Sequence, residues 1–276
     1  MLRIGCVKYL NARPLIYGWS GAVDFDHPAA LCRKLEHGDL DVALVSSLEY
    51  LRRPIYRIVD GVSISAHGAV YSVIVAHNED LSRAQEIDID PASETSVVLL
   101  RCLLRQRGFN PRLRVRNTDV QSVRPAELHS AEPETADSMS ARRTGQGPVF
   151  RLLIGDQAIR FRAAHGERYH YWDLAETWTK MTSLPFAFAF WLIRPEIENA
   201  KEIADKLRAL RDHNVASIDE LALSQSEVSP TFCRKYYREH LFFDFGEREK
   251  AGLREFHRRC LLNKIDVAPD LRLNLV

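Results

Sequence analysis

The sequence predicts an α/β protein of two lobes, with mixed sheets, helices on both sheet faces and a ligand cleft between the lobes. Short β-branched or apolar runs alternate with segments of helical period, which is typical of α/β folds with largely parallel sheets. The chain has 276 residues, 46% hydrophobic and 27% charged, and is long enough to bury a core in each of two lobes. Two extended apolar stretches, residues 68–78 and 183–195, bracket a middle segment with strands and helices of its own.

These two stretches set the predicted division of the chain. One lobe takes both chain ends, residues 1–76 and 187–276, and the other takes the middle, residues 77–186. Two connections between lobes leave a cleft between them, and small-molecule sites favour such domain interfaces.

The individual elements follow from local patterns. Strands are predicted for the short apolar runs at 2–7, 42–45, 69–76, 86–89, 150–154 and 186–193. Apolar residues four apart predict helices at 28–37 and 95–107, with Gly38 and Gly108 as stops. After residue 196 the pattern is amphipathic and helical throughout, so helices should cover a sheet already made.

One segment breaks this order. Residues 117–148 are rich in Ser, Thr, Pro, Gly and charge, with few large apolar residues. This composition predicts a long loop or a disordered insert that carries no chemistry.

Composition excludes several classes of function. The 38 Lys and Arg nearly balance the 37 Asp and Glu, so the net charge of +1 favours neither nucleic acid nor an anionic membrane as partner. The first residues lack a secretory signal and no apolar run reaches the length of a membrane span, which predicts a cytoplasmic protein. The five cysteines are scattered without a CxxC pair, and no HExxH spacing occurs, so neither a disulfide framework nor a metal site is expected. No nucleotide-binding or GxSxG motif is present, and no cofactor is predicted.

The most informative stretch is "IDIDPASETSVVLLRCLL", residues 87–104. Ser93, Thr95 and Ser96 cluster at the start of a strong helix. Hydroxyls, backbone N–H groups and the positive end of the helix dipole together favour a carboxylate or phosphate ligand. The alternative is that one of these hydroxyls only caps the helix.

Two further strand-to-helix turns carry candidate residues. In "LLIGDQAIR", Gly155 and Asp156 directly follow a buried strand, at the edge where open α/β sheets bind ligands. Ser46 and Ser47 have the same setting in "DVALVSSLEYL". Asp156 is equally suited to be a helix cap, and for the two serines capping is the favoured interpretation.

Near the N-terminus, "VKYLNARPL" places Asn11 where a strand gives way to a proline-marked helix start. Asn is among the best helix N-caps, and Pro14 is harmless in a first turn. The alternative is that Asn11 faces a ligand, which depends on what the rest of the chain builds around it.

Six stretches together resemble the chorismate dehydratase family of the futalosine route to menaquinone: "VKYLNARPL", "GDLDVALVSSLEYL", "GAVYSVIV", "DPASETSVVLLRCLL", "LLIGDQAIR" and "WTKMTSLPFAFAFW". They occur in the family's order and cover nearly the whole chain except residues 117–148 and the helical C-terminus. The resemblance implies a fold like that of type II periplasmic binding proteins. It also implies a hydro-lyase reaction in which chorismate, the small-molecule partner, loses water to give 3-[(1-carboxyvinyl)oxy]benzoate. The product ring is aromatic, so the reaction needs no cofactor.

The same resemblance implies roles for particular residues. Asn11 and Ser72 would point into the cleft, and Thr95 and Ser96 would hold a substrate carboxylate. This favours Asn11 as a substrate-facing group over a cap. A neutral amide cannot take a carbon-bound proton, so the base is either Asp156 or a carboxylate of the substrate.

The resulting predictions group into two sets. The predicted catalytic residues are Asn11, Ser72 and Asp156, and the predicted substrate-binding residues are Ser46, Ser47, Gly68, Ser93, Thr95, Ser96 and Gly155.

Three other functions compete with this one. A solute-binding protein of the same fold would need an export signal, and a ligand-sensing regulator would need a helix-turn-helix ahead of the first strand. The related naphthoate-forming cyclase of the same pathway is a nearer rival, but its N-terminal motif differs from YLN followed by a proline helix.

Overall fold

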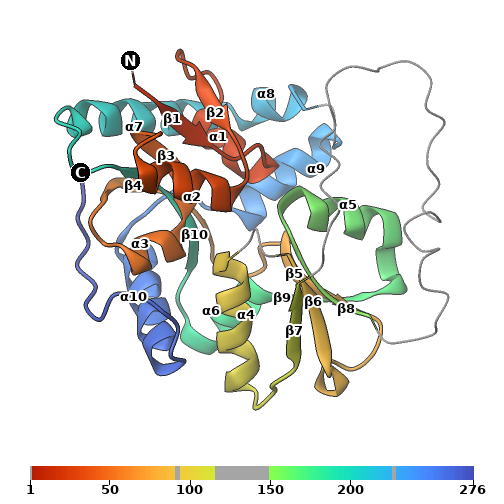
Figure 1. The fold of residues 1–276 in the computed structure, drawn as a ribbon. Helices are drawn as coiled ribbons and strands as arrows, with labels where there is room; N and C mark the ends of the chain where they lie inside the picture. Colours follow the sequence, from red (N-terminus) through yellow and green to blue (C-terminus); the bar gives the residue numbers. More distant parts are fainter. Residues whose placement is uncertain (1, 91–93, 116–148, 226–227) are drawn as a thin grey trace.

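The computed structural model describes residues 2–90, 94–115, 149–225 and 228–276, and in this part of the chain two five-stranded mixed sheets form separate halves (Figure 1). The strand order is β2-β1-β3-β10-β4 in the first sheet and β7-β6-β8-β5-β9 in the second. Both chain termini lie beside the first sheet (Figure 1). The predicted segment 117–148 and the predicted site residue Ser93 lie outside the described residues.

The first sheet consists of β1 (Ile4–Cys6), β2 (Val23–Phe25), β3 (Val42–Ser46), β4 (Arg57–Ala66) and β10 (Phe186–Ile193). β1 pairs in parallel with β2 and β3, whereas β10 runs antiparallel between β3 and β4. Phe190 stands opposite Val45 on one side and Ser63 on the other. The continuous apolar run of β10 follows from this central position, because the strand is covered on both faces.

The second sheet consists of β5 (Val73–His77), β6 (Glu86–Ile89), β7 (Arg112–Val115), β8 (Phe150–Ile154) and β9 (His170–Asp173). β6 pairs in parallel with β7 and β8, and β5 runs antiparallel between β8 and β9. The antiparallel pairs of both sheets thus come from β5 and β10, the strands that follow a passage from one sheet to the other. This explains why parallel pairing is less dominant than the alternation of elements predicts.

Helices cover the sheets. They are η1 (Leu10–Ala12), α1 (Arg13–Ile16), α2 (Pro28–His37), α3 (Ser47–Arg52), η2 (Leu81–Arg83), α4 (Glu94–Gln106), α5 (Gly155–His165), η3 (Gly166–Arg168), α6 (Leu174–Thr182), α7 (Ala200–Ala216), α8 (Ile218–Leu223), α9 (Pro230–Lys235), the π-helical turn η4 (Tyr236–His240) and α10 (Glu247–Leu262). The C-terminal helices α7 and α10 pack against β4 and β10 as predicted. No helix in the described ranges is both long and apolar enough to span a membrane.

The passages between the sheets differ from the predicted crossing strands. The predicted strand 69–76 begins only at Val73, because residues 67–72 form the loop that connects β4 to β5. The second passage follows α6, and β10 lies wholly in the first sheet. The predicted lobe limit at residue 76 therefore falls inside β5, a strand of the second sheet.

One buried carboxylate ties the first passage to α6. Asp173 accepts hydrogen bonds from the backbone N–H groups of Val70 at 3.2 Å and Tyr71 at 2.8 Å, and it caps α6 through Ala175 and Glu176 at 3.0 Å each. Burial raises the pKa of this carboxyl, and the N–H donors oppose that rise. Tyr71 has a φ of +69°, a conformation that non-glycine residues adopt at a cost of about 1–3 kcal/mol. Asp173 therefore helps to hold a strained backbone directly before Ser72.

Candidate active site

Two neighbouring cavities adjoin residues 9–11. The smaller, here called the site cavity, lies between the two sheets and is lined by Asn11, Ser46, Ser72, Thr95, Ser96 and Gly155, with apolar walls that include Val45, Ile154 and Phe188. Six of the ten predicted site residues thus meet in one place. They come from the ends of strands and the starts of helices of both lobes, as the prediction of an interlobe cleft requires.

Asn11 lies within η1, directly after β1. The residue that precedes α1 as its N-cap is Ala12, and the structure shows no side-chain cap bond at either helix start. The Asn11 amide oxygen is buried and has no hydrogen-bond partner among the described residues. The capping interpretation is therefore wrong. A buried unpaired amide oxygen costs about 1–3 kcal/mol, so its place at a cavity marks a point where a polar ligand would be stabilised.

Thr95 and Ser96 lie in the first turn of α4, and both are buried. The Thr95 hydroxyl accepts a hydrogen bond from the backbone N–H of Leu48 at 3.3 Å, which ties the start of α4 to α3. A 13-residue helix presents N–H donors and the positive end of its dipole at this point. The start of α4, with these two hydroxyls, therefore forms one end of the cavity, and an anion there would be favoured.

Ser72 occupies the end of the first passage, where the backbone joins the two lobes. Its side chain is fully buried and accepts a hydrogen bond from the hydroxyl of Tyr236 at 2.6 Å. The next residue, Tyr237, donates to the carbonyl of Leu10 at 3.0 Å. Two adjacent tyrosines of η4 thus support both Ser72 and the turn that carries Asn11.

Sequence reasoning missed these tyrosines. The stretch "SPTFCRKYYREHL" shows only amphipathic helical spacing, and no local motif marks two hydroxyls that reach residues more than 150 positions away.

Gly155 begins α5 with a φ of +51°, and its N–H donates to the Ser72 carbonyl at 2.8 Å. A Cβ here would lie 3.3 Å from the ring of Tyr9, so a larger residue would press on that side chain. Burial raises the pKa of Tyr9 to about 12, and this ring borders the site cavity as a neutral phenol.

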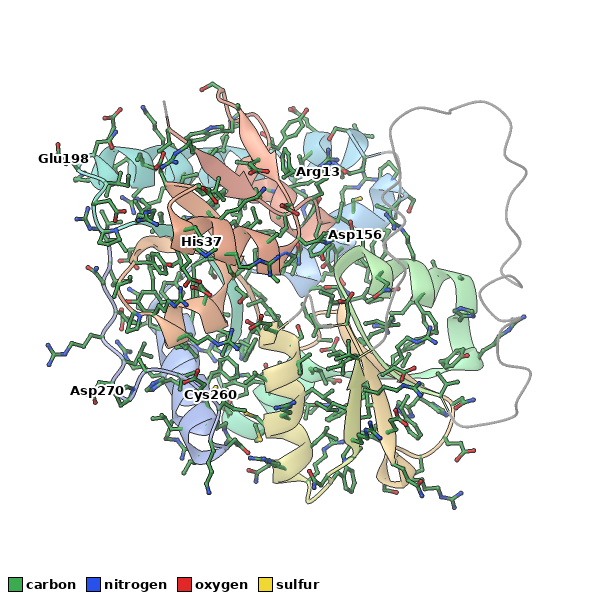
Figure 2. All side chains as sticks on the ribbon, viewed as in Figure 1. Arg13, His37, Asp156, Glu198, Cys260 and Asp270 are labelled. Atoms are coloured by element: carbon green, nitrogen blue, oxygen red, sulfur yellow. The ribbon has the colours of Figure 1, made fainter. Side chains whose placement is uncertain are left out.

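Asp156 points to the other side of residues 9–11. Its Oδ1 accepts a hydrogen bond from the backbone N–H of Leu10 at 2.9 Å, so the start of α5 grips the turn that carries Asn11. The N-cap of α5 is Ile154, and Asp156 is the second residue inside the helix, so the capping alternative is also wrong for Asp156. Figure 2 places Asp156 at the end of α5 nearest the first lobe.

Three other predicted residues have different surroundings. Ser46 is the N-cap of α3 and makes no side-chain cap bond with the residues described, although capping was its favoured interpretation. Ser47 is buried away from the lining of the site cavity, and its hydroxyl has no partner in the described chain. Gly68 has a φ of +112° and donates its N–H to the Thr179 hydroxyl at 3.0 Å, which places it in the first passage.

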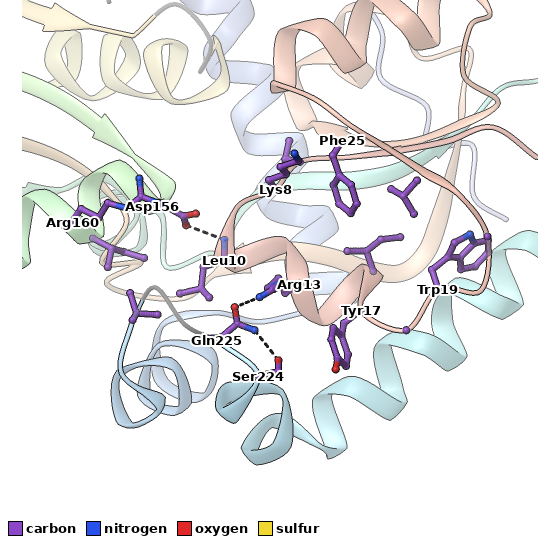
Figure 3. A pocket seen from close by; sticks show the side chains of 17 residues that line it. Lys8, Leu10, Arg13, Tyr17, Trp19, Phe25, Asp156, Arg160, Ser224 and Gln225 are labelled. Atoms are coloured by element: carbon purple, nitrogen blue, oxygen red, sulfur yellow. Dashed lines mark hydrogen bonds between the residues drawn. The ribbon is translucent and has the colours of Figure 1, made fainter. Parts of the chain in front are cut away.

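The second cavity is larger, about 570 Å3, and is shown in Figure 3. Asp156 and Arg160 of α5 face Lys8 and Arg13 across it, and Arg13 donates to the side chain of Gln225. Size alone would favour this cavity. We place the candidate site in the smaller one, because polar groups from both lobes converge there and one of them lacks a partner among the described residues.

Within the described ranges, no three His, Cys, Asp or Glu side chains come together in a group that would hold a metal ion.

Comparison with known proteins agrees with the motifs. The sequence model of a family described as menaquinone biosynthesis matches residues 2–261. A chorismate dehydratase of Thermus thermophilus is 30% identical over 280 residues, covering 92% of this chain and 93% of the relative. A chorismate dehydratase of Campylobacter jejuni is 23% identical, with 91% and 90% covered.

Among solved structures, the alkanesulfonate-binding protein of Xanthomonas axonopodis pv. citri superposes with a TM-score of 0.60 at 12% identity, covering 100% of this chain and 97% of that one. At that identity the likeness concerns the fold alone, and it confirms the predicted periplasmic-binding-protein-like fold. Because the family match spans nearly the whole chain and the Thermus relative reaches 30% identity, this protein belongs to the menaquinone-biosynthesis family of the chorismate dehydratases.

Proposed function

We propose that this protein is a carbon–oxygen lyase that removes water from chorismate to give 3-[(1-carboxyvinyl)oxy]benzoate in menaquinone biosynthesis. The observation that carries the proposal is the buried, unpartnered amide oxygen of Asn11 in a cavity that also presents the hydroxyls of Ser72, Thr95 and Ser96. These groups suit a substrate with two carboxylates and one hydroxyl.

The elimination balances without an external oxidant or reductant. The C–H bond on the ring carbon next to the hydroxyl-bearing carbon breaks, and its electron pair completes the aromatic ring. The C–O bond of the hydroxyl breaks at the same time, so the proton and the hydroxide leave together as water. The protein has to orient the substrate, stabilise the departing oxygen and let a base reach the ring proton.

The elimination also needs a base that takes the ring proton, and the two candidates are Asp156 and a carboxylate of the substrate. The Asp156 carboxylate lines the neighbouring cavity and is engaged by the Leu10 N–H at 2.9 Å. This position supports a role for Asp156 in holding the Asn11 turn. A carboxylate of the substrate itself then becomes the favoured base. Bound chorismate brings both this carboxylate and the ring proton into the site cavity.

Replacing both Thr95 and Ser96 with alanine is expected to weaken chorismate binding at least tenfold. Each hydroxyl bond to a charged group is worth about 1.5–3 kcal/mol when buried, and about 1.4 kcal/mol corresponds to a tenfold change in Kd. Isothermal titration with chorismate measures this loss.

The matched control removes two other buried hydroxyls, those of Ser63 and Ser65 in β4. These hydroxyls donate to the backbone carbonyls of Asp244 and Phe242. The Ser63→Ala and Ser65→Ala double variant should bind chorismate normally if it folds. Normal chorismate binding by the folded double variant of Thr95 and Ser96 would contradict the proposal that these residues hold a substrate carboxylate.

The proposed reaction is tested by incubating the purified protein with chorismate and identifying the product by mass spectrometry. We expect a product lighter by one water, formed in an amount equal to the chorismate consumed. Prior treatment with EDTA should leave the rate unchanged, because no step requires a metal ion. Chorismate recovered intact from a tight complex would instead indicate a solute-binding protein.

A further inference from the structure

Tyr236 connects the C-terminal part of the chain to the passage between the sheets. It lies at the start of η4, its side chain is fully buried, and its hydroxyl is 2.6 Å from the hydroxyl oxygen of Ser72. The Tyr236 ring stacks on Phe232 with ring centres 5.7 Å apart and an angle of 13° between planes. Ring packing thus holds the phenol in place, and the hydroxyl adds one directed contact.

The direction of this hydrogen bond follows from burial. Two hydroxyl groups in contact share one proton, and either can donate in principle. The Tyr236 hydroxyl makes no other hydrogen bond to the part of the chain that is described. If Ser72 were the donor, the phenol proton would be buried without an acceptor. Tyr236 therefore donates, and the proton of Ser72 has to point elsewhere.

Burial also raises the pKa of Tyr236, which keeps its hydroxyl protonated and able to donate at neutral pH.

The backbone around Ser72 leaves the site cavity as the direction for that proton. The Ser72 carbonyl accepts from the N–H of Gly155 at 2.8 Å, and the preceding residue, Tyr71, is held at a positive φ. Asp173 binds the Tyr71 N–H, and Arg162 donates to the Tyr71 carbonyl at 3.1 Å. The backbone is therefore fixed on both sides of Ser72, whose side chain lines the site cavity.

We infer that Tyr236 is a positioning residue that makes Ser72 a directed hydrogen-bond donor to the departing oxygen of the substrate. By occupying a lone pair of Ser72, the phenol turns the serine proton toward the cavity. A donor fixed in this way stabilises negative charge on an oxygen at the moment when the C–O bond breaks. The inference rests on the proposed function, since it assigns a role within that elimination.

The test is a double-mutant cycle of Tyr236→Phe and Ser72→Ala, with kcat and KM measured for chorismate. Tyr236→Phe keeps the ring and removes only the hydroxyl. We expect it to lower kcat about tenfold or more, the size of effect typical of residues that orient a site group, with KM nearly unchanged. In the Ser72→Ala background the same substitution should change kcat by less than about twofold, because Tyr236 acts through Ser72.

Two other tyrosines are the matched controls. Tyr50→Phe removes a buried hydroxyl that bonds to the backbone of Arg272 and Asn274 and does not line the site cavity, so it should leave kcat per folded molecule unchanged. Tyr237→Phe removes the hydroxyl that supports Leu10, and any loss of kcat it causes should persist in full in the Ser72→Ala background.

The outcomes separate this inference from the proposed function. A wild-type protein that leaves chorismate unchanged contradicts the proposed function. If wild type is active and Tyr236→Phe lowers kcat equally with and without Ser72, or leaves kcat unchanged, the positioning role is wrong. Should Tyr236→Phe alone not fold, Ser72→Ala is compared with the double variant. The inference requires their kcat values to agree within about twofold, and a larger difference would contradict it.

Discussion

Replacing Asn11 with alanine should lower the kcat for chorismate about a hundredfold or more in a protein that remains folded. Removing one preorganised polar group from a closed site typically has an effect of this size. The Asn11 amide oxygen has no partner among the described residues, so its loss leaves no protein group unpaired there and the fold should not suffer. Thermal unfolding alongside kcat separates the two effects, and near-normal turnover by the folded variant would exclude a catalytic role.

The Asn11→Asp variant tests the same role of Asn11 by adding a negative charge. The side chain keeps its size but places a negative charge beside a substrate with two carboxylates, so we expect both weaker binding and poor turnover. The matched control is Asn214→Ala. Asn214 is a buried asparagine that donates to the carbonyls of Pro14 and Tyr17 and lies outside the site cavity. Its loss should lower the melting temperature and leave kcat per folded molecule close to wild type.

The largest expected loss of stability comes from Asp173→Ala. This carboxylate accepts hydrogen bonds from four backbone N–H groups, and those of Val70 and Ala175 are buried. Leaving a buried donor unsatisfied costs about 1–3 kcal/mol, so we expect the free energy of unfolding to fall by about 3 kcal/mol or more. The strained φ of Tyr71 would also lose a restraint, so Ser72 should move and turnover should fall in the fraction that folds.

Urea unfolding followed by circular dichroism measures this loss. Asp80→Ala is the control, because Asp80 also caps a helical turn, accepting from the N–H of Ser82 at 2.8 Å, but it is exposed. That substitution should lower the free energy of unfolding by no more than about 0.5–2 kcal/mol, the range typical of a lost helix cap. Equal losses for the two variants would mean that Asp173 is an ordinary cap and does not hold the passage between the sheets.

Elements with strong local patterns were predicted closely. The helix at 28–37 has its predicted bounds and stops at Gly38, whose φ of +82° suits glycine, and α4 begins and ends within one residue of its prediction. The strands β2, β4, β7 and β9 were missed. In β4, Asp60 and Gly61 interrupt the apolar pattern of the sequence. β2 is short and largely exposed, and β9 starts in a polar stretch, so none of these three strands has a clear apolar pattern.

The candidate site likewise has a part that the sequence could predict and a part that it could not. Asn11, Thr95 and Ser96 lie in strand-to-helix turns, where chain direction alone places polar groups at a sheet edge, and they meet in the site cavity. The bond from Asp156 to Leu10 and the bond from Tyr236 to Ser72 join segments far apart in the sequence. Only tertiary packing creates such contacts, and local spacing carries no sign of them.

The proton NMR time course of chorismate with the wild-type protein, run beside the Asn11→Ala variant at equal concentration, tests the central claim most directly. With wild type, we expect the olefinic ring signals of chorismate to be replaced one for one by aromatic signals. With Asn11→Ala, the olefinic signals should persist over the same period. Chorismate that persists with both proteins, or conversion by the variant at the wild-type rate, would contradict this claim.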